Sequence, residues 1–505
     1  MKKSFYFLVF VAAFFWINPL HAKANEGDQL LNRKTDPIIV ERDAVPIMIE
    51  DPDGGGVSYD IYKASGTIYY ENDEANFYYP TRNVKVSLII MVHSTGEYFS
   101  FDTFADENGY YYVQTSPMRV LISGQYTTYI KVSLVNDDFG IYKSKDYDGN
   151  YVFSVDINWL NAPIIWLTGD MDATPSNELI YSSLYLTSFN GNTTVKNINI
   201  SCSNDFGKAV NIHQSLLVGF KYLSMVNPNF DYDYLKVFSP INLQNIIHTN
   251  LPISVPTTNF YMASDVTLAW GYYRFPVGEY INLNINYGGD VMFIAPNSWD
   301  SIDIVLHEMG HYVADQHDFS RFIGADHSTN DHHVNFFGKD IGAALAWSEG
   351  FADFFSVASQ KYVKSNANYP ALSVVDDFAM DYNIEFGTDI SGNPYVQYLG
   401  ENSEGTISMF LYDLIDLNSV SDTHDNVYIP DTTFFNYLNT FDPVENFSDF
   451  WNQLSISPLD TNYGTLLKYY KFSPVQTSPS NNSSTTTNSP TFSWQRQQDG
   501  SSLPT

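Results

Sequence analysis

The segment Leu-His-Glu-Met-Gly-His at positions 306–311 combines three side chains that can bind a metal or move a proton. His307 and His311 are four residues apart, so on a helix they project from one side, about 40° apart. Their imidazoles can therefore reach one metal ion, while Glu308 beside them can act as a general base. The competing interpretation is a pair of hydrogen-bonded core histidines. Apolar residues at helical spacing around the segment predict a helix over 302–316 and favour the metal site.

A catalytic zinc site needs a third protein ligand, because such an ion usually takes three protein ligands and one water. His317 is one candidate, because His311 and His317 have the spacing of a His-x-x-Gly-x-x-His pattern. In this chain Ala314 stands at the position of the glycine. Alanine favours continuation of the helix, and residue 317 would then point about 120° away from His311. His317 is therefore the alternative third ligand rather than the favoured one.

The favoured third ligand lies in the segment Ala-Trp-Ser-Glu-Gly-Phe-Ala-Asp-Phe-Phe at 346–355. Glu349 and Asp353 are four residues apart on a helix predicted over 342–363, so they share one face. One carboxylate can bind a metal ion while the other accepts a hydrogen bond from the free ring N–H of a histidine ligand. The aromatic residues around the pair argue against a purely solvated face. We expect Glu349 rather than His317 to complete the ligand set.

The pattern His307-Glu-x-x-His311 followed by Glu349-x-x-x-Asp353 resembles the gluzincin metallopeptidases, of which thermolysin is a familiar member. The chain is also similar to secreted bacterial proteins of thermolysin-like type that carry a comparable Trp-Ser-Glu-Gly-Phe-Ala-Asp-Phe-Phe segment. Those proteins have a later helix similar to Ser-Glu-Gly-Thr-Ile-Ser-Met-Phe-Leu-Tyr-Asp-Leu, which stands at 403–414 here. The resemblance covers roughly residues 200–475.

This resemblance implies that His307, His311 and Glu349 bind Zn²⁺, that Glu308 activates the water on the ion, and that Asp353 supports a ligand histidine. It implies a zinc-dependent endopeptidase that acts on protein or peptide substrates. The 37 residues between the second histidine and the glutamate are many more than in thermolysin, which leaves the ligand set to be tested. The alternative function is a zinc-binding but non-proteolytic cell-surface or adhesin-like protein, and the intact glutamate of the first motif argues against it.

Peptide hydrolysis also needs a donor for the developing oxyanion besides the metal. His424 is the candidate, because Asp425 beside it could orient its ring. Tyr382 and Tyr398 are further candidates. No spacing rule relates any of these side chains to the zinc, so an ordinary surface or core role competes with each of them.

Calcium is a second expected cation. The loops Asp-Tyr-Asp at 146–148 and Asp-Met-Asp-Ala-Thr at 170–174 place carboxylates two residues apart, as calcium loops do. Both loops fall short of a full ligand set, and ordinary turns explain the same spacing.

The first 24 residues are typical of an export signal. Lysines at positions 2 and 3 precede an apolar stretch at 5–17, and small residues at 22–24 offer a cleavage site. The 13 residues of that stretch are fewer than the roughly 20 that a membrane-spanning helix needs, and no later segment approaches a span. We therefore expect a secreted or cell-surface protein without a membrane span after signal removal.

Composition narrows the partners and the sources of stability. The 505 residues include 57 Asp and Glu against 25 Lys and Arg, a net charge of −32. This excess repels phosphate backbones, so we expect no nucleic-acid partner. Cys202 is the only cysteine, which excludes an intramolecular disulfide. Stability must therefore come from the hydrophobic cores, which 44% hydrophobic residues can supply, and from bound metal.

The chain is expected to be multidomain, with an N-terminal antiparallel β-sandwich followed by an α+β thermolysin-like domain whose C-terminal half is helical. After a leader or propeptide-like segment at 25–62, short β-branched and aromatic runs over 63–160 predict the sandwich, which weakly resembles transthyretin-like and immunoglobulin-like modules. This module could serve surface attachment. Residues 164–475 form the expected metallopeptidase domain, with further helices predicted over 205–226, capped by Asn204, and over 404–416.

The carboxyl end changes in composition. Residues 476–490 are rich in Ser, Thr, Asn and Pro, which predicts a flexible linker. Residues 491–505 begin with Thr-Phe-Ser-Trp, which resembles the first strand of a fibronectin-like module. Because few residues follow, we expect either a truncated module or a disordered tail.

Overall fold

The structure is a computed structural model in which the chain divides into two units, Met1–Ser58 and Tyr59–Thr505. All described residues belong to the second unit. They are residues 59–72, 77–119, 125–142, 153–158, 164–169, 180–182, 193–239, 260–262, 273–274, 280–285, 290–294, 298–319, 333, 339–364, 378–379, 382–389, 391–416, 427–454, 461–472, 475–478 and 493–495. The expected signal peptide at 1–24 and both expected calcium loops lie outside them.

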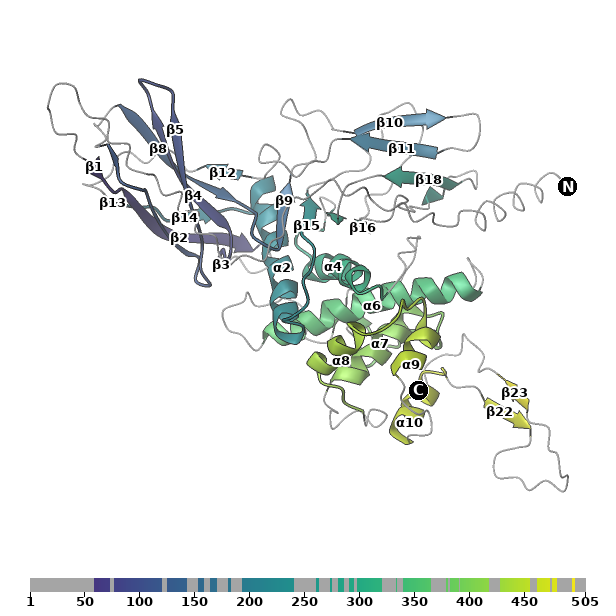
Figure 1. The fold of residues 1–505 in the computed structure, drawn as a ribbon. Coiled ribbons are helices and arrows are strands. Elements are labelled where there is room, and N and C mark those ends of the chain that lie inside the picture. The colour runs from purple at the N-terminus through teal and green to yellow at the C-terminus, as the bar shows by residue number, and fades with distance from the viewer. Residues whose placement is uncertain are drawn as a thin grey trace, which may run out of the picture. The chain divides into compact units, whose positions relative to one another are not determined.

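The N-terminal part is rich in β-structure and contains a four-stranded and a five-stranded sheet (Figure 1). A four-stranded antiparallel sheet has the order β12-β8-β4-β5 and comprises β12 (Ile180–Ser182), β8 (Tyr126–Ser133), β4 (Lys85–Val92) and β5 (Tyr98–Phe104). A five-stranded sheet is centred on β2 (Lys63–Asn72) and adds β3 (Phe77–Pro80), β6 (Tyr110–Gln114), β13 (Thr193–Val195) and β14 (Ile198–Ile200).

Alternation of buried and half-exposed side chains explains why β2 forms the centre of its sheet. Ala64, Gly66, Ile68 and Tyr70 are buried, and the residues between them are partly exposed. This period of two places one face of the strand on a core. The buried side chains of β4, β6 and β8 belong to the same hydrophobic cluster, so the two sheets share one core.

Strand pairing differs from the expected antiparallel module over 63–160. β13 and β14 come after that module in sequence, yet both pair with β2 in parallel. β9 (Phe139–Tyr142) lies inside the expected module, yet it pairs in parallel with the later strand β15 (Leu235–Phe238). Parallel partners are joined by long connections, so no local signal in the sequence identifies them. Residues on both sides of the expected boundary therefore contribute to the same sheets.

The remaining described strands form two further four-stranded sheets and several strand pairs, some of which join distant parts of the chain. β15 and β9 continue into β19 (Val291–Phe293) and β16 (Phe260–Met262), in the order β16-β19-β15-β9. A second set has the order β10-β11-β18-β17, with β10 (Phe153–Asn158), β11 (Ile164–Gly169), β18 (Tyr280–Ile285) and β17 (Tyr273–Arg274). Two-stranded pairs are β1 (Tyr59–Asp60) with β7 (Met118–Arg119), and β20 (Phe378–Ala379) with β21 (Tyr382–Asn383).

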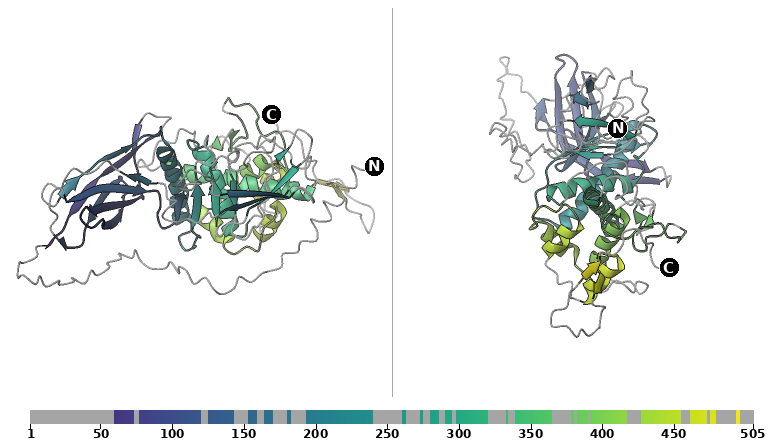
Figure 2. Two further views of the ribbon diagram at one scale, coloured as in Figure 1. Left: turned by 90° about the horizontal axis from the view of Figure 1, so that it is seen from above. Right: turned by 90° about the vertical axis from the view of Figure 1, so that its right-hand side faces the viewer.

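The C-terminal half is helical, and its helices run from teal to yellow in Figure 2. They are α2 (Asp205–Val226), α4 (Ile302–Gln316), α6 (Lys339–Lys364), α7 (Glu404–Ile415), α8 (Asp431–Leu438), α9 (Phe447–Leu454) and α10 (Thr461–Tyr469). The four predicted helices are confirmed, and the side chain of Asn204 caps α2 by accepting a hydrogen bond from the Gly207 amide at 2.9 Å. Among the described residues, no helix has the length and apolar character of a membrane span.

α2 links the helices to the β-rich part. It packs against α4 and α6 and also against β2 and β9. The Gln214 side chain donates to the backbone carbonyl of Arg82 at 3.0 Å and accepts from the Arg82 amide at 3.2 Å. A long helix buried on nearly all sides is a core element, and α2 therefore supports the two helices that carry the site.

The end of the chain also differs from expectation. Val475–Ser478 forms β22, which pairs antiparallel with β23 at Ser493–Gln495. The first residues of the expected linker at 476–490 are therefore in a strand, and the Thr-Phe-Ser-Trp segment provides its partner. The composition of residues 476–490 is dominated by the polar residues in the middle of the segment. A prediction from composition therefore misses the strand at its start.

A buried histidine in α2 predicts a pH dependence of stability. Burial lowers the pKa of His213 from 6.5 to about 3, so the ring is neutral in the folded chain. The unfolded chain binds the proton first, and stability falls as pH drops from 6.5 toward 3. We expect His213→Gln to reduce the change in unfolding free energy between pH 6 and pH 5 by up to about 1.4 kcal/mol. Urea unfolding of the metal-free chain measures this, and identical pH dependence in both chains would contradict it.

Candidate metal centre

Two adjacent helices carry the candidate site. α4 begins after Ser301, whose side chain accepts a hydrogen bond from the Ile304 amide at 3.4 Å. Its buried residues include apolar side chains on several faces as well as His307 and His311. Polar side chains in such a setting need partners, because an unpaired buried polar group is costly. α6 supplies those partners.

Glycines set the spacing of the helices. A Cβ added at Gly310 would lie 2.6 Å from the Cα of Ala352, so α4 approaches the backbone of α6 more closely than any other residue would allow. A Cβ at Gly350 would lie 2.6 Å from the Cβ of Ile407, so α6 approaches α7 in the same way. The glycines of both motifs therefore bring the polar side chains of three helices within reach of one another.

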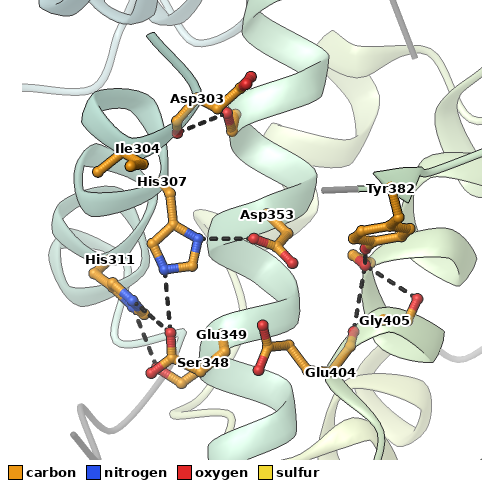
Figure 3. A network of polar contacts seen from close by, with 12 residues as sticks. Asp303, Ile304, His307, His311, Ser348, Glu349, Asp353, Tyr382, Glu404 and Gly405 are labelled. Carbon is orange, nitrogen blue, oxygen red and sulfur yellow. Dashed lines mark hydrogen bonds and ion pairs between the residues drawn. The ribbon is translucent and has the colours of Figure 1, made fainter. Parts of the chain in front are cut away.

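The three predicted ligands converge between α4 and α6 (Figure 3). One carboxylate oxygen of Glu349 lies 3.2 Å from Nε2 of His307 and 2.9 Å from Nε2 of His311. The two imidazole rings are nearly perpendicular, with centroids 4.9 Å apart. The three ligand atoms all lie within 4.8 Å of one another. Two imidazole nitrogens and one carboxylate oxygen at this separation fit a single divalent metal ion.

Asp353 orients one of the histidines. Its Oδ1 lies 2.8 Å from Nδ1 of His307, so this nitrogen can donate to the carboxylate and Nε2 is left for a metal. Ser348 lies 3.4 Å from Nδ1 of His311 through its hydroxyl. Each histidine therefore has a neighbour that fixes its ring from behind. The serine was not identified from the sequence, and its position directly before Glu349 is the only signal for it.

The electrostatics of the cluster suit a cation. Burial alone would lower the pKa of His307, but hydrogen bonds to Asp353 and Glu349 outweigh it and hold this pKa well above its ordinary value. Burial raises the pKa of Asp353 to about 6 against the lowering effect of its bond to His307, and the charges of Glu404 and Glu349 raise it too. The carboxylates thus repel one another in a poorly solvated space, and a bound divalent ion would relieve that repulsion.

Glu308 lies beside His307 on α4 and is 7% exposed. Its carboxylate is therefore largely shielded from water and belongs to the same helix as the two histidines of the candidate site, which keeps it a candidate general base.

His317 has a different environment. α4 ends at Gln316, and Nε2 of His317 lies 3.0 Å from the Tyr232 hydroxyl while its ring packs on Phe230 with centroids 4.1 Å apart. Burial lowers the pKa of His317 to about 4. The structure thus brings Glu349 to the two histidines of α4 and holds His317 among aromatic side chains.

The three expected oxyanion donors differ in what the structure shows of them. His424 lies outside the described residues. Tyr382 is fully buried, its hydroxyl contacts that of Ser408, and its ring stacks on Tyr395. Tyr398 is half-buried, and its backbone carbonyl accepts from the Thr406 hydroxyl.

Substitution of the histidines should separate the two candidate ligand sets. We expect His311→Gln to weaken zinc binding by more than about 100-fold, since even changes behind the ligands cost 10–100-fold. His317→Gln should leave zinc affinity unchanged. Competition against a chromophoric chelator on the metal-free chain measures both. Loss of affinity in His317→Gln to the same extent would contradict the arrangement described here.

Comparison with solved structures gives only weak likenesses. The major plantain pollen allergen Pla l 1 aligns at 13% identity and a TM-score of 0.14, covering 29% of this chain and 97% of that one. A 9R-lipoxygenase from Cyanothece PCC8801 aligns at 11% identity and a TM-score of 0.15, covering 84% of this chain and 69% of that one. TM-scores this low say nothing about the fold. No curated protein matches the sequence.

A family model gives the informative similarity. Residues 256–468 match the model described as the mycolysin C-terminal domain. That range includes α4, α6 and α7, and with them the histidines and carboxylates of the candidate metal centre. The chain is therefore similar, over the region that carries this centre, to a peptidase family of thermolysin-like type.

Proposed function

We propose that the protein is a secreted zinc-dependent endopeptidase whose thermolysin-like domain extends over about residues 164–475. The observation that carries this proposal is the buried cluster of His307, His311 and Glu349, whose ligand atoms lie within 4.8 Å of one another. Similarity to the mycolysin C-terminal domain supports it independently. The metal is proposed to be zinc because two imidazoles and one carboxylate form a common ligand set for catalytic zinc.

Each residue of the cluster has a proposed task. His307 and His311 would bind the ion through Nε2 and Glu349 through a carboxylate oxygen, while Asp353 holds the ring of His307. When bound, Zn²⁺ would polarise the substrate carbonyl and make a coordinated water acidic enough to react near neutral pH. A set of three protein ligands would leave a further position on the ion for that water.

Glu308 is the proposed general base. It would accept a proton from the attacking water and return that proton to the leaving nitrogen of the peptide. Its limited contact with solvent keeps the proton within the site during this transfer. His424 is retained as the proposed donor to the oxyanion, with Tyr398 as a second choice. The export signal and the β-rich part suit action outside the cell, where the latter could attach the enzyme to a surface.

The proposal is tested by hydrolysis of casein with the purified secreted chain. We expect Glu308→Gln to lower the rate by about 10²–10⁴-fold, because a positioned base contributes that much. Zinc stoichiometry should stay the same in this variant, since Glu308 is not a proposed ligand. A chelator should abolish activity in the wild type, and His317→Gln serves as the control substitution that retains it.

The same experiment separates the alternative function. A wild type and Glu308→Gln that are equally inactive, each with one zinc bound per chain, would favour the non-proteolytic binding protein. Equal activity of the two chains would exclude Glu308 as the base.

A further inference from the structure

The helix α7 begins with a buried acid that the proposed reaction does not use. Ser403 caps this helix by accepting a hydrogen bond from the Thr406 amide at 3.4 Å, and Glu404 is the first helical residue. A carboxylate in the first turn interacts favourably with the helix dipole and so stabilises the helix, but such residues usually face water. Glu404 is only 1% exposed. Its burial therefore calls for a reason beyond starting the helix.

Glu404 lies against the part of α6 that carries the ligand. A Cβ on Gly350, the residue after Glu349, would lie 2.7 Å from the carbonyl oxygen of Glu404. The side chain of Glu404 extends from the start of α7 toward α6, on the side of Glu349 and below Asp353 (Figure 3). Its charge also acts on Asp353 and on Tyr382. Glu404 is thus a further acid of the buried cluster, one layer behind the three ligands.

A histidine from the segment between α4 and α6 faces this acid. Nε2 of His333 lies 3.4 Å from a carboxylate oxygen of Glu404, and both residues are 1% exposed. The His333 amide donates to the Asn402 carbonyl at 3.1 Å, which places the ring at the start of α7. The Ser408 hydroxyl donates to the Glu404 carbonyl at 3.3 Å. Both ends of the acid are therefore held in place.

We propose that Glu404 is a positioning residue of the metal centre, whose negative charge behind Asp353 and Glu349 strengthens the binding of a divalent cation. The inference rests on the proposed metal-binding function. It assigns a role to the segment at 403–414, which is similar to a helix of thermolysin-like proteins. Buried like charges repel one another in the metal-free chain, and a cation removes that cost when it binds. Each acid of the cluster therefore adds to cation affinity, including one that does not touch the ion.

The test measures zinc affinity of the metal-free secreted chain by competition with a chromophoric chelator. We expect Glu404→Gln to weaken binding by about 10-fold or more. Asp413→Asn is the matched control, because Asp413 is 2% exposed, belongs to the same helix, and lies about 13 Å further along it. The Tyr470 hydroxyl donates to Asp413 at 2.7 Å, so the control also loses a buried carboxylate with a partner. Zinc affinity should be unchanged in the control.

A merely structural role gives a different pattern. It would lower the unfolding temperature of Glu404→Gln equally with and without zinc and leave the affinity unchanged. The proposed role predicts a smaller increase in unfolding temperature on zinc addition than in the wild type or in Asp413→Asn. A folded Glu404→Gln chain with wild-type affinity, or an equal loss in Asp413→Asn, would overturn the proposal.

Glu404→Asp is the second variant, because it keeps the charge but withdraws the carboxylate from His333. Its zinc affinity should lie between those of the wild type and Glu404→Gln. Should Glu404→Gln fail to fold, a folded Glu404→Asp chain that loses zinc affinity by about 10-fold or more overturns the proposal, because the negative charge is still present. A wild type that binds no zinc overturns the proposed function as well. A wild type that binds zinc and cleaves casein, beside a Glu404→Gln chain of equal affinity, overturns this inference alone.

Discussion

The close approach of α4 to α6 at Gly310 is the constraint on which the candidate centre depends. With no side chain between them, the two helices can share polar groups that would otherwise be too far apart to meet. His307 and His311 face Glu349 and Asp353 across this contact at hydrogen-bonding distances. A second glycine, Gly350, allows the same close approach between α6 and α7. Three helices thus concentrate acids and imidazoles in a space from which their apolar neighbours exclude water.

Concentrating charge in this way costs folding free energy, because buried carboxylates are poorly solvated and repel one another. The chain has no disulfide to offset that cost. It has instead a hydrophobic cluster that extends from the β-sheets through α2 to the last helices. This large core offsets the cost of the buried carboxylates, and a cation that bound at the centre would stabilise the folded chain further.

Much of the candidate site could be predicted because it depends on helical periodicity. Helix phase predicted Glu349 rather than His317 beside His307 and His311, as the structure places them, although α4 ends at Gln316 and does not continue through residue 317 as expected. A local capping signal gave the start of α2. The pairing of β2 with β13 and β14 could not be predicted, since it joins residues more than 100 positions apart. The contact between His333 and Glu404 could not be predicted either, because it too joins residues far apart in the sequence. Neither residue has a periodic partner, and only packing of α7 on α6 brings that acid to the centre.

Strands from before and after residue 160 pair with one another, and this has a consequence for any cleavage between them. β9 precedes residue 160 and pairs with β15, while β12, β13 and β14 follow residue 160 and pair with β8 and β2. A protease that cut the backbone near residue 160 would therefore break one covalent bond and leave five strand pairs joining the two fragments, of which β10 with β11 is the fifth. The two fragments would stay together as a nicked protein, and release of the N-terminal part as a free propeptide would require those strand pairs to separate.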